Sequence, residues 1–161
     1  MFLAGQRLTA DLLNLTVDPL VEVSATSDAS LSNTEAVVLT LPSATFKANT
    51  AYRAWVGGGI FLSSGSTLAA FALRKGTAVG GSTIISFTRM SAISINLELH
   101  VNLQSVFVVG ASDVTTQMCL SIGTNGTNTG TYKGATGGNP RHVTIYPAGD
   151  ASKYTNRPTL T

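Results

Sequence analysis

Two histidines are the side chains of this sequence best suited to acid–base chemistry near neutral pH. His100 follows Glu98 by two residues, which places both side chains on one face of a strand. Such a pair can bind a metal ion or relay a proton. It is equally typical of a solvated strand face, and that is the more ordinary interpretation. His142 follows Asn-Pro-Arg at the expected start of a strand and is interpreted as a loop or interface residue.

Other patterns that carry chemistry are missing from the sequence. There is no Gly-x-Ser-x-Gly elbow and no phosphate-loop lysine motif, and the eight carboxylates are dispersed. Cys119 is the only cysteine, which excludes a disulfide within the chain and a zinc site built from cysteine pairs. We therefore predict a protein that is not an enzyme, with no catalytic residue, metal or cofactor. An enzyme that acts on cell-wall polymer is the least favoured alternative.

The element that would position these groups is the stretch Ile93–Val109. Its odd-numbered residues are apolar and its even-numbered residues polar as far as Gln104, the pattern of a strand with one buried and one solvated face. From Val106 onward both faces are apolar, so another sheet or subunit is expected to cover that end. Seventeen residues at about 3.3 Å each would span roughly 55 Å, which predicts a bend or turn around 102–105.

Further strand patterns recur along the chain and predict an all-β fold. Gly57-Gly58-Gly59 interrupts one of them and predicts either a bulge or the close approach of another backbone. In the range 35–41, Val37, Leu39 and Leu41 are expected to point the same way. Short turns without crossover helices favour an antiparallel β-sandwich, with a jelly roll as first choice and an immunoglobulin-like sandwich as second. The predicted strands are 20–25, 35–41, 51–62, 68–75, 83–90, 93–109, 114–122 and 142–147.

The first residues differ from the rest of the chain. Leu8–Asn14 has a possible N-cap at Thr9 and an acidic residue, Asp11, in the first turn. A helix this short is not stable alone and must dock against something. We divide the chain into an N-terminal docking arm, 1–15, and a β-sandwich domain, 16–161. The residues expected to make the docking contacts are Phe2, Leu3, Gln6, Arg7, Leu8, Leu12 and Leu13.

The segment 123–140 is rich in Gly, Thr and Asn and is predicted to be a long loop of the functional or mobile kind. It is a possible exposed site for a cell-surface glycan, through Asn125, Asn128, Tyr132, Lys133 and Asn139. It is equally compatible with a loop that binds no ligand. Six aromatic residues could stack on sugars, although Trp55 is expected to lie in the core or at a subunit interface. They are Tyr52, Trp55, Phe61, Tyr132, Tyr146 and Tyr154.

Composition points to an assembled protein. Charged residues make up 11% of the chain, against about 25% in typical soluble domains. We infer that neighbouring subunits cover part of the surface, although a plain sandwich with a Ser/Thr-rich surface would also fit. The net charge of +2 is scattered, which argues against nucleic acid, and no apolar run approaches the roughly 18 residues that cross a bilayer. The charge order at the start is wrong for a secretory signal, so synthesis and folding in a cytosol are expected.

Three segments carry a resemblance to a known group of proteins. Phe2-Leu-Ala-Gly-Gln-Arg-Leu-Thr-Ala-Asp-Leu-Leu-Asn14 resembles the opening of small virion proteins of tailed bacteriophages. The ranges 52–76 and 148–152, with the Pro158-Thr-Leu tail, are similar to the sandwich and C-terminus of such proteins in phages of actinobacteria. The resemblance implies a minor tail or capsid decoration protein. It also implies assembly as a homotrimer, contacts with capsid or tail proteins through the arm, and a place in the virion after synthesis in the host bacterial cytoplasm.

Two functions of different classes follow. The first is a non-enzymatic structural subunit of a phage particle. The alternative is a host-surface module at the tail tip that binds glycan through the loop 123–140 and exposed aromatic residues.

Overall fold

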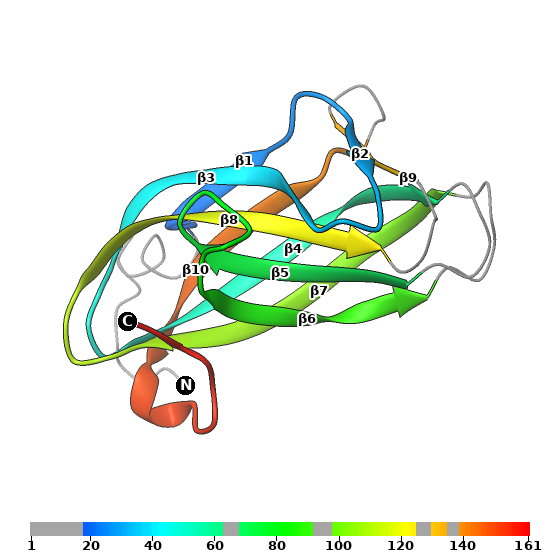
Figure 1. Ribbon diagram of the computed structural model, residues 1–161. Helices are drawn as coiled ribbons and strands as arrows, with labels where there is room; N and C mark the ends of the chain where they lie inside the picture. The colour runs from blue at the N-terminus through cyan, green and yellow to red at the C-terminus, as the bar shows by residue number, and fades with distance from the viewer. Residues whose placement is uncertain (1–17, 63–67, 92–97, 125–129, 135–138) are drawn as a thin grey trace, which may run out of the picture.

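The computed structural model describes residues 18–62, 68–91, 98–124, 130–134 and 139–161, which form two packed β-sheets (Figure 1). Sheet one has the strand order β1 (Val21–Ser24), β10 (His142–Asp150), β4 (Thr50–Leu62), β7 (Glu98–Val109) and β11 (Thr159–Leu160). Its remaining strands are β9 (Gly130–Tyr132), paired with β4, and β2 (Ala29–Leu31), paired with β9. Sheet two has the order β3 (Ala36–Phe46), β8 (Val114–Thr124), β5 (Leu68–Lys75) and β6 (Thr83–Ser91). A 3-10 turn, η2 (Ala151–Lys153), follows β10.

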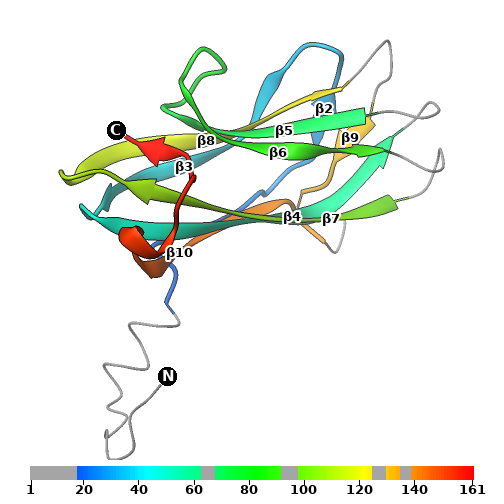
Figure 2. The same cartoon turned by 90° about the horizontal axis from the view of Figure 1, so that it is seen from below.

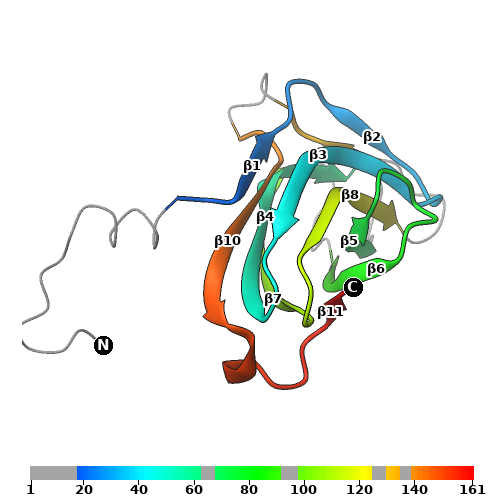
Figure 3. The ribbon, with the colours of Figure 1, turned by 90° about the vertical axis from the view of Figure 1, so that its left-hand side faces the viewer.

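The strand order is that of a jelly roll. Without the short strands β2, β9 and β11, the chain changes sheet at every connection except the one between β5 and β6, so that β1-β10-β4-β7 faces β3-β8-β5-β6. The two layers are separate when the molecule is viewed from below (Figure 2), and Figure 3 shows them from one end. All pairs are antiparallel except β11 with β7, which is parallel. The prediction of an all-β, jelly-roll-like sandwich is confirmed.

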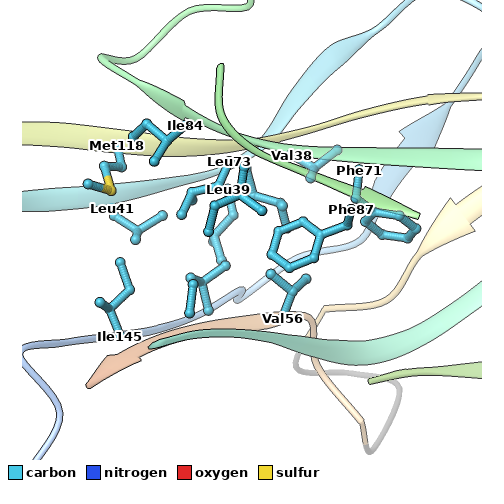
Figure 4. Packing of buried hydrophobic residues seen from close by; sticks show 14 of the residues in the cluster. Val38, Leu39, Leu41, Val56, Phe71, Leu73, Ile84, Phe87, Met118 and Ile145 are labelled. Atoms are coloured by element: carbon cyan, nitrogen blue, oxygen red, sulfur yellow. The ribbon is translucent and has the colours of Figure 1, made fainter. Parts of the chain in front are cut away.

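The core fills the space between the sheets. Figure 4 shows Val56 and Ile145 of sheet one facing Leu39, Leu73 and Met118 of sheet two, and all five are buried. Near one end, the rings of Phe46, Tyr52 and Phe107 form a cluster with centroids 5.1 to 5.8 Å apart. Aromatic packing of this kind adds about 0.5–1.5 kcal/mol per pair beyond the burial of apolar area.

Strand β7 confirms most of the pattern read from its sequence. The odd-numbered residues Val101, Phe107 and Val109 are buried in the core, and Val106, on the opposite face, is only 8% exposed. The C-terminal segment runs along this end of the strand, since the Val108 amide donates to the Pro158 carbonyl over 2.9 Å. Of the bend or turn expected around 102–105, the turn is excluded, because β7 pairs with β4 without a register shift from Glu98 to Val108. Residues 92–97 lie outside the described part of the chain.

Strand β3 departs from the alternation that its sequence suggested. A register shift between Val37 and Leu39 in the pairing with β8 changes which residues face inward. Val38 and Leu39 are therefore both buried, at 7% and 9% exposure, whereas Val37 is only partly buried. The predicted docking arm, including its short helix, falls on residues outside the described ranges. Among the described residues, no helix is long and apolar enough to cross a membrane.

Candidate functional site

The outer face of sheet one, which points away from the core, gathers most of the polar and aromatic groups singled out by the sequence. Side chains alternate between the two faces of each strand, and register places the outward-facing ones in rows across β10, β4 and β7. One row is Thr144, Trp55 and Gln104, and the next is Tyr146, Arg53 and Val106. A third row contains His142, Gly57 and Asn102.

Trp55 is held in place on this outer face. Its indole Nε1 donates to the Asn102 Oδ1 over 2.9 Å. The His142 ring meets it edge-on, with centroids 5.1 Å apart and an interplanar angle of 86°. We expected Trp55 to lie in the core or at a subunit interface. It is only partly buried and does not belong to the core. Arg53 was the signal in the sequence that Trp55 faces solvent, because residues two apart on a strand share a face and an arginine is rarely buried.

A groove of about 420 Å³ lies beside Trp55, within the range typical of small-molecule sites. Trp55 and Tyr146 present partly exposed aromatic surface to it, and Arg53 and Gln104 are exposed. Within the described part of the chain, the Arg53 guanidinium forms no ion pair or hydrogen bond through its side chain. The groove is lined by Arg53, Trp55, Gln104, Tyr146, Pro147 and Ala148.

Gly57 and Gly59 lie on the outer face of β4, in line with Trp55, and Gly58 between them belongs to the opposite face. A Cβ on Gly57 would collide with the His142 ring, and a Cβ on Gly59 with the Glu98 carboxylate. Gly58 has φ of +125°, and its added Cβ would lie 2.5 Å from the Arg141 Cα. Of the two explanations that the sequence left open, close approach of another backbone is therefore the right one.

Glu98 and His100 both lie exposed on this face. His100 Nδ1 contacts the side-chain nitrogen of Asn139, whose carbonyl accepts a hydrogen bond from the Gly59 amide over 2.9 Å. No group of three His, Cys, Asp or Glu residues that could hold a metal occurs in the described ranges. The arrangement fits the solvated strand face that was the more ordinary interpretation. His142 is separate from this pair and packs against Trp55.

The predicted exposed loop 123–140 must be corrected at Tyr132. Gly130–Tyr132 is strand β9, and the Tyr132 ring is fully buried against Phe71, with centroids 5.9 Å apart. Its hydroxyl donates to the Gly57 carbonyl over 2.7 Å, and burial raises the pKa of this phenol above its ordinary value. The surrounding Gly, Thr and Asn residues have no apolar period, so nothing in the sequence marks this ring as part of the core.

The other residues predicted for this loop are only partly placed. Lys133 is partly buried, with its Nζ 3.5 Å from Asp28 Oδ2, and Asn139 lies next to His100. Asn125 and Asn128 lie outside the described residues. The docking-arm residues do so as well: Phe2, Leu3, Gln6, Arg7, Leu8, Leu12 and Leu13.

Arg141 is a buried charge that the sequence analysis missed. Its guanidinium donates to the carbonyls of Val38 at 2.7 Å, Ser27 at 2.6 Å and Tyr132 at 2.9 Å. Burial lowers the pKa of Arg141 from its ordinary value. Because Val38 belongs to sheet two and Tyr132 to sheet one, this side chain links the two layers. No local pattern distinguishes it from a surface arginine, since its partners come from distant parts of the chain.

The outer face of sheet two carries a different arrangement, centred on an ion pair. Arg74 donates to both Glu35 carboxylate oxygens at 2.8 Å, and Ser121 donates to the same carboxylate at 2.5 Å. Desolvation by itself would raise the pKa of Glu35, but the bonds from Ser121 and Arg74 outweigh it and leave the pKa below its ordinary value. Arg74 Nη1 also donates to the Thr83 hydroxyl at 2.7 Å. This network is saturated and serves the fold.

Comparison with known proteins identifies the fold. No protein-family model and no curated protein sequence matches this chain. The T13 viral particle of infectious bursal disease virus contains a similar structure, with a TM-score of 0.50 at 15% identity. The match covers 83% of this chain and 32% of the viral one. For the VP2 subviral particle of the same virus, the TM-score is 0.48 at 14% identity, covering 87% of this chain and 35% of that chain.

A further solved structure is also similar. Eiger TNF from S. frugiperda superposes with a TM-score of 0.45 at 11% identity, covering 87% of this chain and 99% of that one. This chain spans about a third of the viral proteins that it matches. At 15% identity, the similarity to the T13 particle structure concerns architecture alone.

Proposed function

We propose that this protein is a non-enzymatic structural subunit of a tailed phage particle, attached to the capsid or tail through its N-terminal arm. The observation that carries the proposal is the jelly-roll order of the two sheets, β1-β10-β4-β7 over β3-β8-β5-β6. Jelly rolls recur in viral capsid proteins, and the matched structures of infectious bursal disease virus are of viral particles.

Two features of the sequence add support. Residues 2–14 resemble the opening of small tailed-phage virion proteins, which suggests the arm as the attachment point. The low charged fraction of 11% suits a surface that neighbouring subunits partly cover. In this proposal the subunit assembles with copies of itself, as a homotrimer, and with other virion proteins, as a capsid decoration or minor tail protein.

Glycan binding through the loop 123–140, our alternative, loses its main support. Tyr132 is the only aromatic residue of that segment, and its ring is buried between the sheets. A sugar therefore has no aromatic surface to stack on there.

The proposal is tested on purified particles. The full chain and a variant lacking residues 1–14 are each supplied to cells that produce particles from which the gene has been deleted. We expect mass spectrometry to find the full chain on gradient-purified particles and the truncated chain only in the soluble fraction, folded by circular dichroism. Gln6→Ala removes one predicted docking residue without loss of apolar surface, so we expect it to lower occupancy less than the truncation does.

Two outcomes contradict the proposal. Absence of the full chain from particles removes the structural role, and full occupancy by the truncated chain removes the docking role of the arm. Sedimentation equilibrium of the isolated full chain tests the homotrimer.

A further inference from the structure

We propose that the groove on the outer face of sheet one binds a saccharide, with a sugar ring stacked on Trp55 and Tyr146 and its hydroxyl groups bonded by Arg53 and Gln104. The inference goes beyond a structural role and does not rest on it. It moves the glycan-binding surface from the loop 123–140 to the face formed by β10, β4 and β7.

The aromatic surface of the groove suits the apolar face of a sugar ring. Trp55 lies opposite Thr144, and Tyr146 lies opposite Arg53, so the two rings stand on neighbouring strands, one row apart. Rows of side chains on one face are about 6.6 Å apart, since each residue advances a strand by about 3.3 Å. The C–H groups of a pyranose are weakly positive and favour the negative face of an aromatic ring. Both rings are partly exposed beside the groove and can offer that surface.

The polar part of the groove suits hydroxyl groups. A guanidinium has five N–H donors in a planar fork, and a side-chain amide both donates and accepts, which matches neighbouring sugar hydroxyls. Arg53 and Gln104 are exposed at the groove, and no carboxylate is among its lining residues. In the part of the chain that the structure describes, no acidic group neutralises Arg53. We therefore expect an acidic saccharide to bind more tightly than a neutral one of the same size.

The platform is already in place before a ligand arrives. Asn102 fixes the indole nitrogen of Trp55, and His142 packs against its ring at 86°. A rigid aromatic ring loses little conformational entropy on binding, which favours affinity for small ligands.

The sequence supplies a direct probe, because Trp55 is the only tryptophan of the chain. Mild acid releases oligosaccharides from bacterial cell-wall polysaccharide, and these are separated into a neutral and an acidic fraction. Each fraction is titrated into the full chain while tryptophan emission is recorded. We expect a saturable change in emission, with a lower Kd for the acidic fraction. Arg53→Ala and Tyr146→Ala should each raise that Kd by at least about tenfold, a change equal to roughly 1.4 kcal/mol.

Matched controls separate binding from folding. Gln104→Ala should weaken binding, whereas Gln117→Ala, at an exposed position on β8 in the opposite sheet, should leave the Kd unchanged. Trp55→Phe keeps an aromatic face, and its binding, followed by calorimetry, should persist in weakened form. Thermal unfolding of each variant verifies that the fold is intact.

Three results would overturn the inference. The first is the lack of a saturable change with either fraction, and the second is binding that Arg53→Ala and Tyr146→Ala leave unaltered. The third is that, in the absence of sugar, acrylamide quenches Trp55 less as the protein concentration rises. That result would assign this face to contacts between copies of the chain. The particle experiment is independent of all three, so failure here does not affect the structural role.

Discussion

The two outer faces of the sandwich differ in whether the side chain of their arginine is hydrogen-bonded within the protein. On sheet two, Arg74 is saturated by Glu35, Thr83 and the Gly81 carbonyl. On sheet one, Arg53 makes no such contact within the described residues and lies beside Trp55 at a groove. A polar group already satisfied within the protein stabilises the fold and has little left for a ligand. An exposed polar group without a partner in the protein is hydrated by water, costs the fold little free energy and remains available to a ligand. The comparison therefore assigns stability to one face and recognition to the other.

The largest expected effect concerns the backbone beneath the recognition face. Gly58→Ala forces a Cβ into the Arg141 backbone at a φ of +125° and should lower the free energy of unfolding by about 2–4 kcal/mol. Gly149→Ala also has a positive φ, +114°, but its Cβ would meet nothing within 4 Å, so only the strain of about 1 kcal/mol is expected. Urea unfolding measures both. Equal losses in the two variants would show that backbone contact at Gly58 is unimportant.

Removing the arginine of each face tests the comparison itself. Arg74→Met leaves Glu35 partly buried without its cation and should cost about 1.5–3 kcal/mol in urea unfolding. Arg53→Met breaks no described contact and should change the free energy of unfolding by less than about 0.5 kcal/mol. A similar cost for both would mean that the two faces do not differ in this way.

The ion pair on sheet two should also make stability depend on pH. Because the pKa of Glu35 is lower in the folded protein than its ordinary value of 4.5, the stabilisation is present above that value. It is lost as the pH falls through the lower folded pKa. Urea unfolding of the wild type and of Glu35→Gln should therefore differ at pH 7 and converge in the acid range. A difference that persists unchanged at pH 3 would show that ionisation of Glu35 contributes nothing.

The smallest expected effect concerns how firmly the recognition face holds its aromatic ring. Asn102→Ala removes the acceptor of the Trp55 indole and should cost only about 0.5 kcal/mol, because the bond is exposed to water. Tryptophan anisotropy should nevertheless fall, since the ring gains freedom. Ser43→Ala, at an exposed position on β3 in the opposite sheet, is the control for general effects on the fold. Unchanged anisotropy in Asn102→Ala would indicate that His142 alone fixes the ring.

Much of the fold could be predicted from strand periodicity, and its failures have definite causes. The alternation of Val101, Leu103 and their neighbours identified the buried face of β7, because positions that face the core are apolar and positions that face water are polar. Val37 was assigned wrongly because a register shift changed the phase of β3. Such a shift depends on the partner strand and leaves no trace in local alternation.

The candidate site was predicted less well, since its parts come from separate strands. Trp55 was recognised as a possible stacking residue, but the charge of Arg53, which shares its strand face and indicates that this face is solvated, was overlooked. Tyr132 was placed on the surface because its neighbours are small and polar, whereas its ring fills a space between the sheets. The docking arm stays a prediction, because it lies outside the residues that the structure describes.

The sequence by itself determined the class of fold and the buried face of β7. These properties depend on the residue at each position and its near neighbours. Only the tertiary structure decided that Arg141 spans the layers, that Tyr132 is in the core, and that Arg53 and Tyr146 meet at one groove. Each of those contacts joins residues far apart in the chain. The groove depends on the jelly-roll path that brings β10 alongside β4, and the burial of Tyr132 depends on the pairing of β9 with β4.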